Sequence, residues 1–252
     1  MSKLELQNVG LTVNLGTDEE KEILKSTNLE LNDGDFVTLL GTNGAGKSTL
    51  LNLINGSLSP TTGKIILDDE DITALSEVKR AKYISQVFQD PKMGTAPRMT
   101  VAENLLLATK RGEKRGLHLR GLDKNLAIFS RETSKLPNGL NQRLHTFVEN
   151  LSGGQRQTLS FLMATIKRPK LLLLDEHTAA LDPKTSHELL ELTDHVVRQQ
   201  HLTCIMITHQ LKDALKYGNR TIILNSGRIV LDVKGEEKQR LTENDILKYF
   251  TD

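Results

Sequence analysis

The chain has 252 residues, with 33 Lys and Arg against 32 Asp and Glu, a formal net charge of +1, and 37% hydrophobic residues. This length allows one large or two small soluble domains with a substantial core. The net charge is close to zero, so the chain has no overall positive potential that would attract nucleic acid or an anionic membrane surface.

The cysteine count and the hydropathy argue against two further classes of protein: those held by intramolecular disulfides, and those that span a membrane or are secreted. Cys204 is the only cysteine, so no intramolecular disulfide can form, as expected of a chain in a reducing cytoplasm. No stretch approaches the roughly 20 apolar residues of a membrane-spanning helix, and the first residues lack the apolar core of a secretory signal. Any membrane role would therefore depend on a partner.

The N-terminal part predicts strands followed by a phosphate-binding loop and a helix. Residues 4 to 13 and 27 to 40 alternate apolar and polar side chains, and the second region ends just before a glycine-rich segment. Leucine and isoleucine then recur at helical spacing over residues 50 to 54, and Asn55-Gly56 supplies a stop. Further strands are expected at residues 64 to 67 and 83 to 88.

The glycine-rich segment matches the pattern G-x-x-x-x-G-K-[ST] and comprises Gly41, Thr42, Asn43, Gly44, Ala45, Gly46, Lys47 and Ser48. Its glycines let backbone N–H groups converge on phosphate oxygens, Lys47 supplies a cation, and the Ser48 hydroxyl can bind magnesium. Glycine-rich turns also occur by chance. A predicted strand precedes this glycine-rich segment and a predicted helix follows it, and both favour the nucleotide-binding interpretation.

Residues 99 to 150 change to leucines at helical spacing and predict a helical insert, interrupted by Gly112, Gly116, Gly121 and the turn Pro137-Asn138-Gly139. The insert is followed by Leu151, Ser152, Gly153, Gly154 and Gln155. Taken alone, these five residues could simply begin a helix with Ser152 as its cap.

From residue 171 onward, strands and helices alternate, which predicts parallel strands joined by crossover helices. Four leucines at 171 to 174 form a buried strand that ends in Asp175 and Glu176. Such a strand can simply have a polar end. In a phosphate-loop protein, however, Asp175 would approach the metal and Glu176 could accept a proton from an attacking water.

Two more polar residues, Gln89 and His209, follow predicted strands at residues 83 to 88 and 203 to 207. The carboxyl edge of an open parallel sheet is where ligands bind. Each residue alone is weak evidence, because a glutamine is commonly a surface residue and a strand-end histidine is commonly incidental. Near the C-terminus, Thr242 is expected to cap a short amphipathic helix.

The order of these motifs along nearly the whole chain resembles the nucleotide-binding subunit of ATP-binding cassette (ABC) transporters. The resemblance implies an α/β fold: a phosphate-loop core with a mainly parallel sheet, an N-terminal antiparallel β subdomain and an α-helical insert. It also implies a single ABC ATPase domain over residues 1–252. Residues 1–94 and 151–252 would form the core, and residues of about 95–150 the helical subdomain.

The resemblance assigns a role to each motif. Lys47, Ser48 and Thr49 would hold phosphates and Mg²⁺, with Gln89 and Asp175 also at the metal, and Glu176 would be the general base. His209 would contact the terminal phosphate of ATP. In this family two cassettes pair head to tail, so Leu151 to Gln155 and Asp182 would serve the nucleotide bound by a second copy.

Two positions depart from the family pattern. Val13 stands roughly where an aromatic residue usually stacks on adenine. The adenine would therefore form an apolar contact that is weaker than aromatic stacking. His177 stands where proline is usual after the glutamate, and we interpret it as a residue that reshapes the turn.

Several segments, among them residues 88 to 97 and 175 to 182, resemble a bacterial importer group, some of whose members are predicted to handle tryptophan or tyrosine. The expected partners are a transmembrane permease, a second copy of the chain and an extracytoplasmic substrate-binding protein, with no nucleic acid. The chain would sit at the cytoplasmic face of the membrane.

Two alternatives remain open. A soluble cassette protein in translation or DNA repair would commonly carry two cassettes or a long coiled-coil insertion, and neither is present. An unrelated phosphate-loop kinase or GTPase would leave residues 151 to 155 unexplained and lacks an N-K-x-D sequence here.

Overall fold

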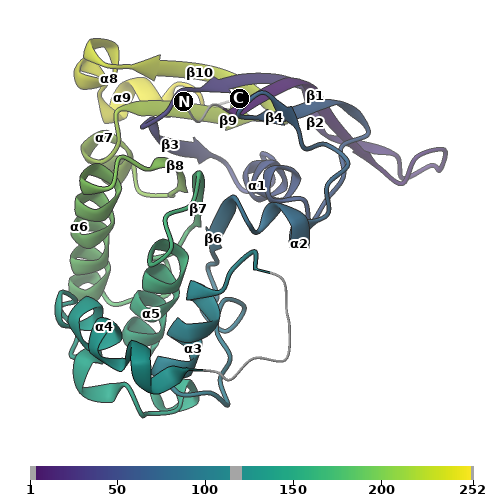
Figure 1. Cartoon of the computed structure of the whole chain (residues 1–252). Helices are drawn as coiled ribbons and strands as arrows, with labels where there is room; N and C mark the ends of the chain where they lie inside the picture. Colours follow the sequence, from purple (N-terminus) through teal and green to yellow (C-terminus); the bar gives the residue numbers. More distant parts are fainter. Residues whose placement is uncertain (1–3, 114–120, 251–252) are drawn as a thin grey trace. The chain divides into compact units, whose positions relative to one another are not determined.

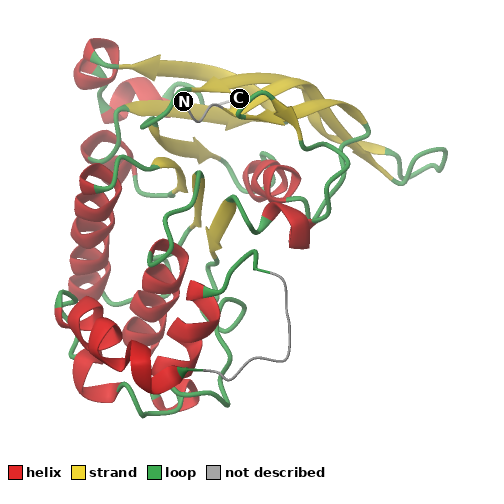
Figure 2. Cartoon of the chain, viewed as in Figure 1, coloured by secondary structure: helices red, strands yellow, loops and turns green. Residues whose placement is uncertain are grey.

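The computed structural model describes residues 4–113 and 121–250 (Figure 1). The chain divides into two compact units, which we call unit 1 (Met1–Arg80 with His201–Asp252) and unit 2 (Ala81–Gln200). Strands dominate unit 1 and helices dominate unit 2 (Figure 2). Gly116, an expected helix breaker, lies outside the described residues. Within the described ranges, no helix has the length and apolar character needed to cross a membrane.

Unit 1 contains the expected antiparallel β subdomain. Its strands lie in the order β2-β1-β4-β5, and their bounds are β1 Leu4–Val13, β2 Lys21–Leu31, β4 Thr62–Leu67 and β5 Glu70–Asp71. Leu4 pairs with Leu31 on one side and with Leu67 on the other, and all three side chains are buried. The alternation of apolar residues thus places one face of this sheet in the core.

The second sheet of unit 1 carries the phosphate loop. Its strands follow the order β10-β9-β3-β8, with bounds β3 Phe36–Gly41, β8 Thr203–Ile207, β9 Arg220–Asn225 and β10 Arg228–Lys234. β3 runs parallel to both β8 and β9. Every residue of β3 and β8 is buried, as expected for strands covered on both faces.

Two sequence expectations for these strands were wrong. Residues 27–40 form the end of β2 and most of β3, because Asn32, Asp33 and Gly34 supply turn residues and Asp35 N–H closes the turn on the Asn32 carbonyl at 3.1 Å. β10 is antiparallel to β9. Ser226 and Gly227 both have positive φ, 48° and 76°, and this makes a tight hairpin where a crossover was expected.

Short helices complete unit 1: α1 Lys47–Asn55, α2 Glu77–Arg80, α7 Leu211–Lys216, α8 Glu236–Arg240 and α9 Glu243–Leu247. Thr242 caps α9 in a capping box with Asp245, which confirms the expected helix start. The buried side chains of Leu40, Ala214, Ile223 and Ile246 form one cluster that packs α7 and α9 against the sheet. The sequence patterns did not indicate α8.

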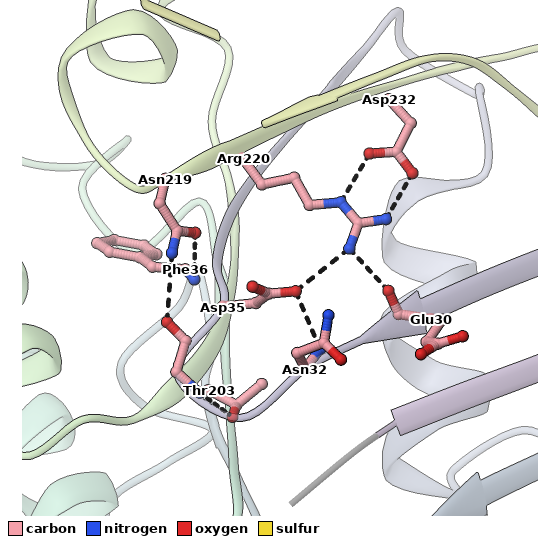
Figure 3. Close-up of polar contacts among 9 residues, drawn as sticks. Glu30, Asn32, Asp35, Phe36, Thr203, Asn219, Arg220 and Asp232 are labelled. Atoms are coloured by element: carbon pink, nitrogen blue, oxygen red, sulfur yellow. Dashed lines mark hydrogen bonds and ion pairs between the residues drawn. The ribbon is translucent and has the colours of Figure 1, made fainter. Parts of the chain in front are cut away.

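A polar network holds the amino end of β3 (Figure 3). The Arg220 guanidinium forms a bidentate pair with Asp232, through Nε at 2.6 Å and Nη2 at 2.5 Å, and a longer pair with Asp35 at 3.3 Å. Arg220 also donates to the Glu30 carbonyl at 2.7 Å. These bonds join β2, β9 and β10 to Asp35, which directly precedes β3, and hydrogen bonding to Asp232 raises the pKa of Arg220.

Unit 2 contains the parallel pair β6 Ile84–Val87 and β7 Leu171–Asp175, and a group of helices. The helices are α3 Val101–Thr109, α4 Leu122–Ser134, the 3-10 turns η1 Leu140–Arg143 and η2 Val148–Asn150, α5 Gly153–Thr165 and α6 Pro183–Gln199. Phe129, Leu105, Leu140 and Leu159 lie in one buried cluster that joins α3, α4 and α5. The expected α-helical insert is therefore present.

Candidate nucleotide-binding and signature sites

The phosphate loop in unit 1 depends on glycines, through close packing at Gly41 and a left-handed backbone conformation at Gly46. A Cβ on Gly41 would stand 2.3 Å from the Leu224 carbonyl oxygen of the neighbouring strand. Gly46 has φ of +103°, and a Cβ there would lie 3.2 Å from the Ile23 carbonyl oxygen. The loop backbone is thus pressed against β2 and β9, while Thr42, Asn43 and Gly44 are exposed on its outer side.

Helix α1 begins at Lys47, directly after this loop. The first N–H groups of an α-helix have no acceptor within the helix, and the helix dipole places partial positive charge there. The Lys47 side chain is buried, and its ammonium donates to the carbonyls of Gly41 at 2.8 Å and Thr42 at 2.9 Å. The glycine loop, the N-terminus of α1 and the Lys47 ammonium therefore lie together, and the exposed Ser48 is next to them.

The opposite end of α1 is held by a residue that sequence reasoning missed. Arg80 is 1% exposed, and its guanidinium donates to the carbonyls of Leu53 at 2.7 Å and Ile54 at 2.8 Å in the last turn of α1. It also donates to Leu75 and Thr73 at 2.9 Å. Burial lowers the pKa of Arg80. A buried arginine that binds backbone carbonyls leaves no periodic pattern in a sequence.

Two further predicted residues lie in unit 1. Val13 is half-buried at the end of β1, where it pairs with Lys21 near the start of β2. Ile23, two residues further along β2, contacts the phosphate loop through its carbonyl, as described above. His209 is exposed and follows β8 by two residues, just before α7. Both therefore lie in the same unit as the phosphate loop.

In unit 2, the two predicted acidic residues end β7. Asp175 is the last residue of the strand and Glu176 follows it, and both are half-buried. Glu176 has φ of +46°, in the left-handed region, which is uncommon for a residue with a side chain. Its carbonyl accepts from Ala179 N–H at 2.9 Å, so the chain turns sharply here. Strain of this kind concentrates at functional sites and requires support from its surroundings.

Gln89 is exposed and follows β6 by two residues. The segment around it is anchored to α5: Gln157 donates to the Phe88 carbonyl at 3.0 Å. A Cβ on Gly94 would lie 2.7 Å from the Ser160 hydroxyl. α5 therefore contacts the segment that carries Gln89.

The motif at residues 151 to 155 begins helix α5. Ser152 and Gln155 form a capping box: Ser152 Oγ accepts from Gln155 N–H, and Gln155 Oε1 accepts from Ser152 N–H, both at 3.2 Å. Leu151 is buried in the helical cluster, whereas Ser152 and Gly153 are exposed. The capping interpretation is thus confirmed, and it presents an exposed helix start that is suited to bind an anion.

The second glycine of this motif contacts the start of α6. A Cβ on Gly154 would lie 2.6 Å from the Thr185 methyl group. Asp182 caps α6 and accepts from Thr185 N–H at 3.1 Å, and its hydrogen bonds with Thr185 lower the pKa of Asp182. Asp182 and residues 151 to 155, both predicted to serve a partner subunit, are therefore linked through Thr185.

His177 follows Glu176 and is 2% exposed. Its Nε2 lies 3.1 Å from the Thr193 hydroxyl of α6, and its ring stacks with Phe161 of α5 at 6.4 Å between centroids. Burial lowers the pKa of His177 to about 4, so the ring is neutral near pH 7. Sequence reasoning noticed His177 only as a departure from the usual proline.

Comparisons with known proteins agree with this geometry. Residues 24–179 match the family "ABC transporter", which covers more than half of the chain. The chain belongs to the ABC transporter family. It is an ATPase subunit that binds ATP, and it has the cassette fold.

A tyrosine transport ATP-binding protein of Clostridioides difficile is 46% identical over 251 residues, covering 98% of each chain. The thiamine import ATP-binding protein of Photobacterium profundum is 38% identical, covering 78% of this chain and 76% of the relative. Among solved structures, the dimeric post-hydrolysis cassette MJ0796 with ADP and Pi has a TM-score of 0.77 at 28% identity, covering 92% of this chain and 98% of that one. A cassette from the cbiONQ transporter complex of Clostridium perfringens has the same TM-score at 26% identity, covering 97% and 92%.

Proposed function

We propose that this ABC subunit powers the import of a small solute, and that the solute is an aromatic amino acid such as tyrosine. The observation that carries the solute class is the 46% identity, along almost the whole of both chains, to a tyrosine transport ATP-binding protein. Importer subunits for other solutes are less similar, at 38% or below for the thiamine, phosphonate and methionine relatives.

ATP is held by the loop from Gly41 to Gly46 together with Lys47, Ser48 and Thr49. The exposed outer side of the loop and the helix start after it supply N–H donors for phosphate oxygens. Val13 contributes an apolar contact for the base, and His209 contacts the terminal phosphate. The Lys47 ammonium, which donates to the Gly41 and Thr42 carbonyls of the loop, supplies the cation for the phosphates.

Mg²⁺ is bound by Ser48, Gln89 and Asp175. A hydroxyl, an amide and a single carboxylate suit this ion, because Mg²⁺ retains waters and takes its remaining ligands from substrate phosphates. The residues that the structure describes hold no cluster of three or more His, Cys, Asp or Glu side chains that would form a closed metal cage. Bound there, the metal would neutralise charge at the phosphates, and Glu176 would remove the proton from the attacking water.

Two copies pair head to tail. The exposed start of α5, with Ser152 and Gly153, offers N–H groups and a positive dipole end to the nucleotide of the other copy. Asp182 lies close by through Thr185 and contributes at the same interface. The similar cassette MJ0796 is dimeric in its post-hydrolysis structure, which supports this assembly.

A permease binds the chain at the cytoplasmic face of the membrane, and an extracytoplasmic binding protein delivers the solute. The similar cassette from Clostridium perfringens is part of the ABC transporter complex cbiONQ, which supports a permease partner for this chain. The helical insert and the segment after Gln89 are the surfaces that dock on the permease.

Hydrolysis and transport are tested together. Glu176→Gln is expected to bind ATP and lower kcat on the order of 10²- to 10⁴-fold, the usual contribution of a general base. Glu188→Gln, on the surface of α6 beside Lys184, is the matched control and should retain activity. Near-normal turnover by Glu176→Gln would remove Glu176 as the base. Cells that carry the chain and its permease should take up labelled tyrosine, and uptake of another solute instead would overturn the solute class.

A further inference from the structure

The backbone at Glu176 needs support that β7 alone does not provide. The strand ends at Asp175, and Glu176 adopts φ of +46°. Such a conformation is unfavourable for a residue with a side chain and persists only where its surroundings enforce it. The next residue, His177, is the first after the strand to be fully buried again.

The His177 ring has a defined partner on α6. Its Nε2 lies 3.1 Å from Thr193 Oγ1, and Thr193 donates its one hydroxyl hydrogen to the Leu189 carbonyl at 2.8 Å. The hydroxyl therefore accepts from His177, which places the ring proton on Nε2. Thr193 is 0% exposed, so no water competes for this bond.

α5 provides the second contact. The Phe161 ring, 1% exposed, stacks on the His177 ring with an interplanar angle of 25°. α5 starts at the exposed residues Ser152 and Gly153, and α6 starts at the Asp182 cap. His177 thus joins the turn at Glu176 to two helices, α5 and α6, whose N-terminal residues are proposed to serve the partner's nucleotide.

We propose that His177 is a positioning residue for Glu176, and that its hydrogen bond to Thr193 fixes the direction of the Glu176 carboxylate. The proposal rests on the proposed role of Glu176 as the base. A proline at this position, usual in the family, would stiffen the turn but offer Thr193 no donor. In this chain the buried ring and its hydroxyl partner take over that task.

The test uses substitutions that separate the hydrogen bond from the packing. His177→Phe keeps a ring beside Phe161 and removes the donor, and Thr193→Val removes the acceptor at nearly constant volume. Each should lower kcat on the order of tenfold to a hundredfold, the loss expected when a reacting group is misplaced by about 1 Å. The KM for ATP should change by less than about twofold, because the phosphate loop is untouched. His177→Gln, which keeps an N–H donor, should recover part of kcat.

Thr133→Val is the matched control. Thr133 is also 0% exposed and donates to the carbonyl four residues earlier, Phe129, at 2.7 Å, but it lies in α4. Both valine variants should lose similar stability, and only Thr193→Val should lose kcat. The double variant His177→Phe with Thr193→Val should be no slower than the slower single variant, because both remove the same bond.

Equal kcat for His177→Phe, Thr193→Val and Thr133→Val, each measured on folded protein, would overturn the proposal and leave His177 as a core residue. If His177→Phe does not fold, Thr193→Val against Thr193→Ser, which keeps the hydroxyl, decides the matter. The proposed role of Glu176 is tested separately: near-normal ATPase activity of Glu176→Gln would show that Glu176 is not the general base. Full activity in His177→Phe beside an inactive Glu176→Gln would reject only the positioning role.

Discussion

Two buried lysines in unit 1, Lys47 and Lys238, have similar burial and similar hydrogen-bond partners, but only Lys47 is proposed to bind the nucleotide. They are 6% and 5% exposed, and both donate to backbone carbonyls: Lys47 to Gly41 and Thr42, Lys238 to Tyr217 and Gly218. Lys47 follows the carboxyl end of β3. Lys238 lies near its amino end, where the Gly218 Cα approaches the Phe36 carbonyl.

Under the proposed function, position on the strand, and not burial or hydrogen bonding, separates a nucleotide-binding lysine from a structural one. At the amino end, side chains hold one another, as Arg220 does with Asp35 and Asp232 (Figure 3). At the carboxyl end, the chain leaves β3 through a glycine loop and enters α1, whose first N–H groups have no acceptor within the helix. Ligands bind at that edge in open parallel sheets.

The largest expected effect is at Lys47. Lys47→Met should lower ATPase kcat on the order of 10²- to 10³-fold, the cost of removing one electrostatic donor from a reacting group. The free energy of unfolding should fall by about 1–3 kcal/mol, because the Gly41 and Thr42 carbonyls lose this donor. Steady-state phosphate release and thermal unfolding measure the two quantities, and a variant that hydrolyses ATP normally would place Lys47 with Lys238 as a structural residue.

Arg220 is the strongest test of the amino end. Arg220→Met leaves the Asp232 and Asp35 carboxylates without their shared partner, so the free energy of unfolding should fall by about 3–5 kcal/mol. Denaturant unfolding measures the loss. Arg240→Met, which removes an exposed pair with Glu236, is the control and should cost no more than about 1 kcal/mol. If folded Arg220→Met loses kcat as Lys47→Met does, the two ends are not functionally distinct.

Lys238→Met should lose less stability than Arg220→Met. Lys238→Met leaves two buried carbonyls without this donor and should lower the free energy of unfolding by about 1–3 kcal/mol. ATPase kcat of the folded protein should equal that of the wild type. Thermal unfolding and phosphate release, measured side by side with Lys47→Met, show whether the two lysines exchange roles.

The smallest effect is expected at the exposed Asp245 of α9. Hydrogen bonds from Lys248 and Thr242 lower the pKa of Asp245 to about 2. Because the folded pKa is depressed, the stabilisation is present above the unfolded value of 3.8 and is lost as the pH falls toward about 2. Asp245→Asn should remove this pH dependence, measured by unfolding between pH 5 and about 2. An identical profile for wild type and variant would show that the cap does not contribute.

The sequence predicts what depends on local pattern. The glycine loop before Lys47, the strand that ends at Asp175 and the cap at Ser152 all follow from spacing and residue type, and the structure has each of these elements. The antiparallel turn of β10 was missed because Ser226 is an uncommon residue at positive φ.

Contacts between distant residues could not be predicted in this way. Thr193 is one of many threonines, and only the packing of α6 brings its hydroxyl to His177. Arg80 and Thr185 are similar cases, because their partners are backbone carbonyls or a glycine Cα without any side-chain signature. These residues support the site and do not form it.

The central claim is that Ser152 and its neighbours serve the nucleotide of a second copy. Asn43→Cys and Ser152→Cys place single reactive thiols on exposed residues of the phosphate loop and of the start of α5. The native Cys204 is 0% exposed, and burial raises the pKa of its thiol, so it should not react.

The two variants, each also carrying Glu176→Gln to slow hydrolysis, are mixed and treated with a short bis-maleimide, with and without ATP and Mg²⁺. The account predicts a covalent dimer that contains one chain of each variant, formed only with ATP and absent when either variant is treated alone. An ATP-independent yield, or no mixed dimer at all, would contradict the head-to-tail site.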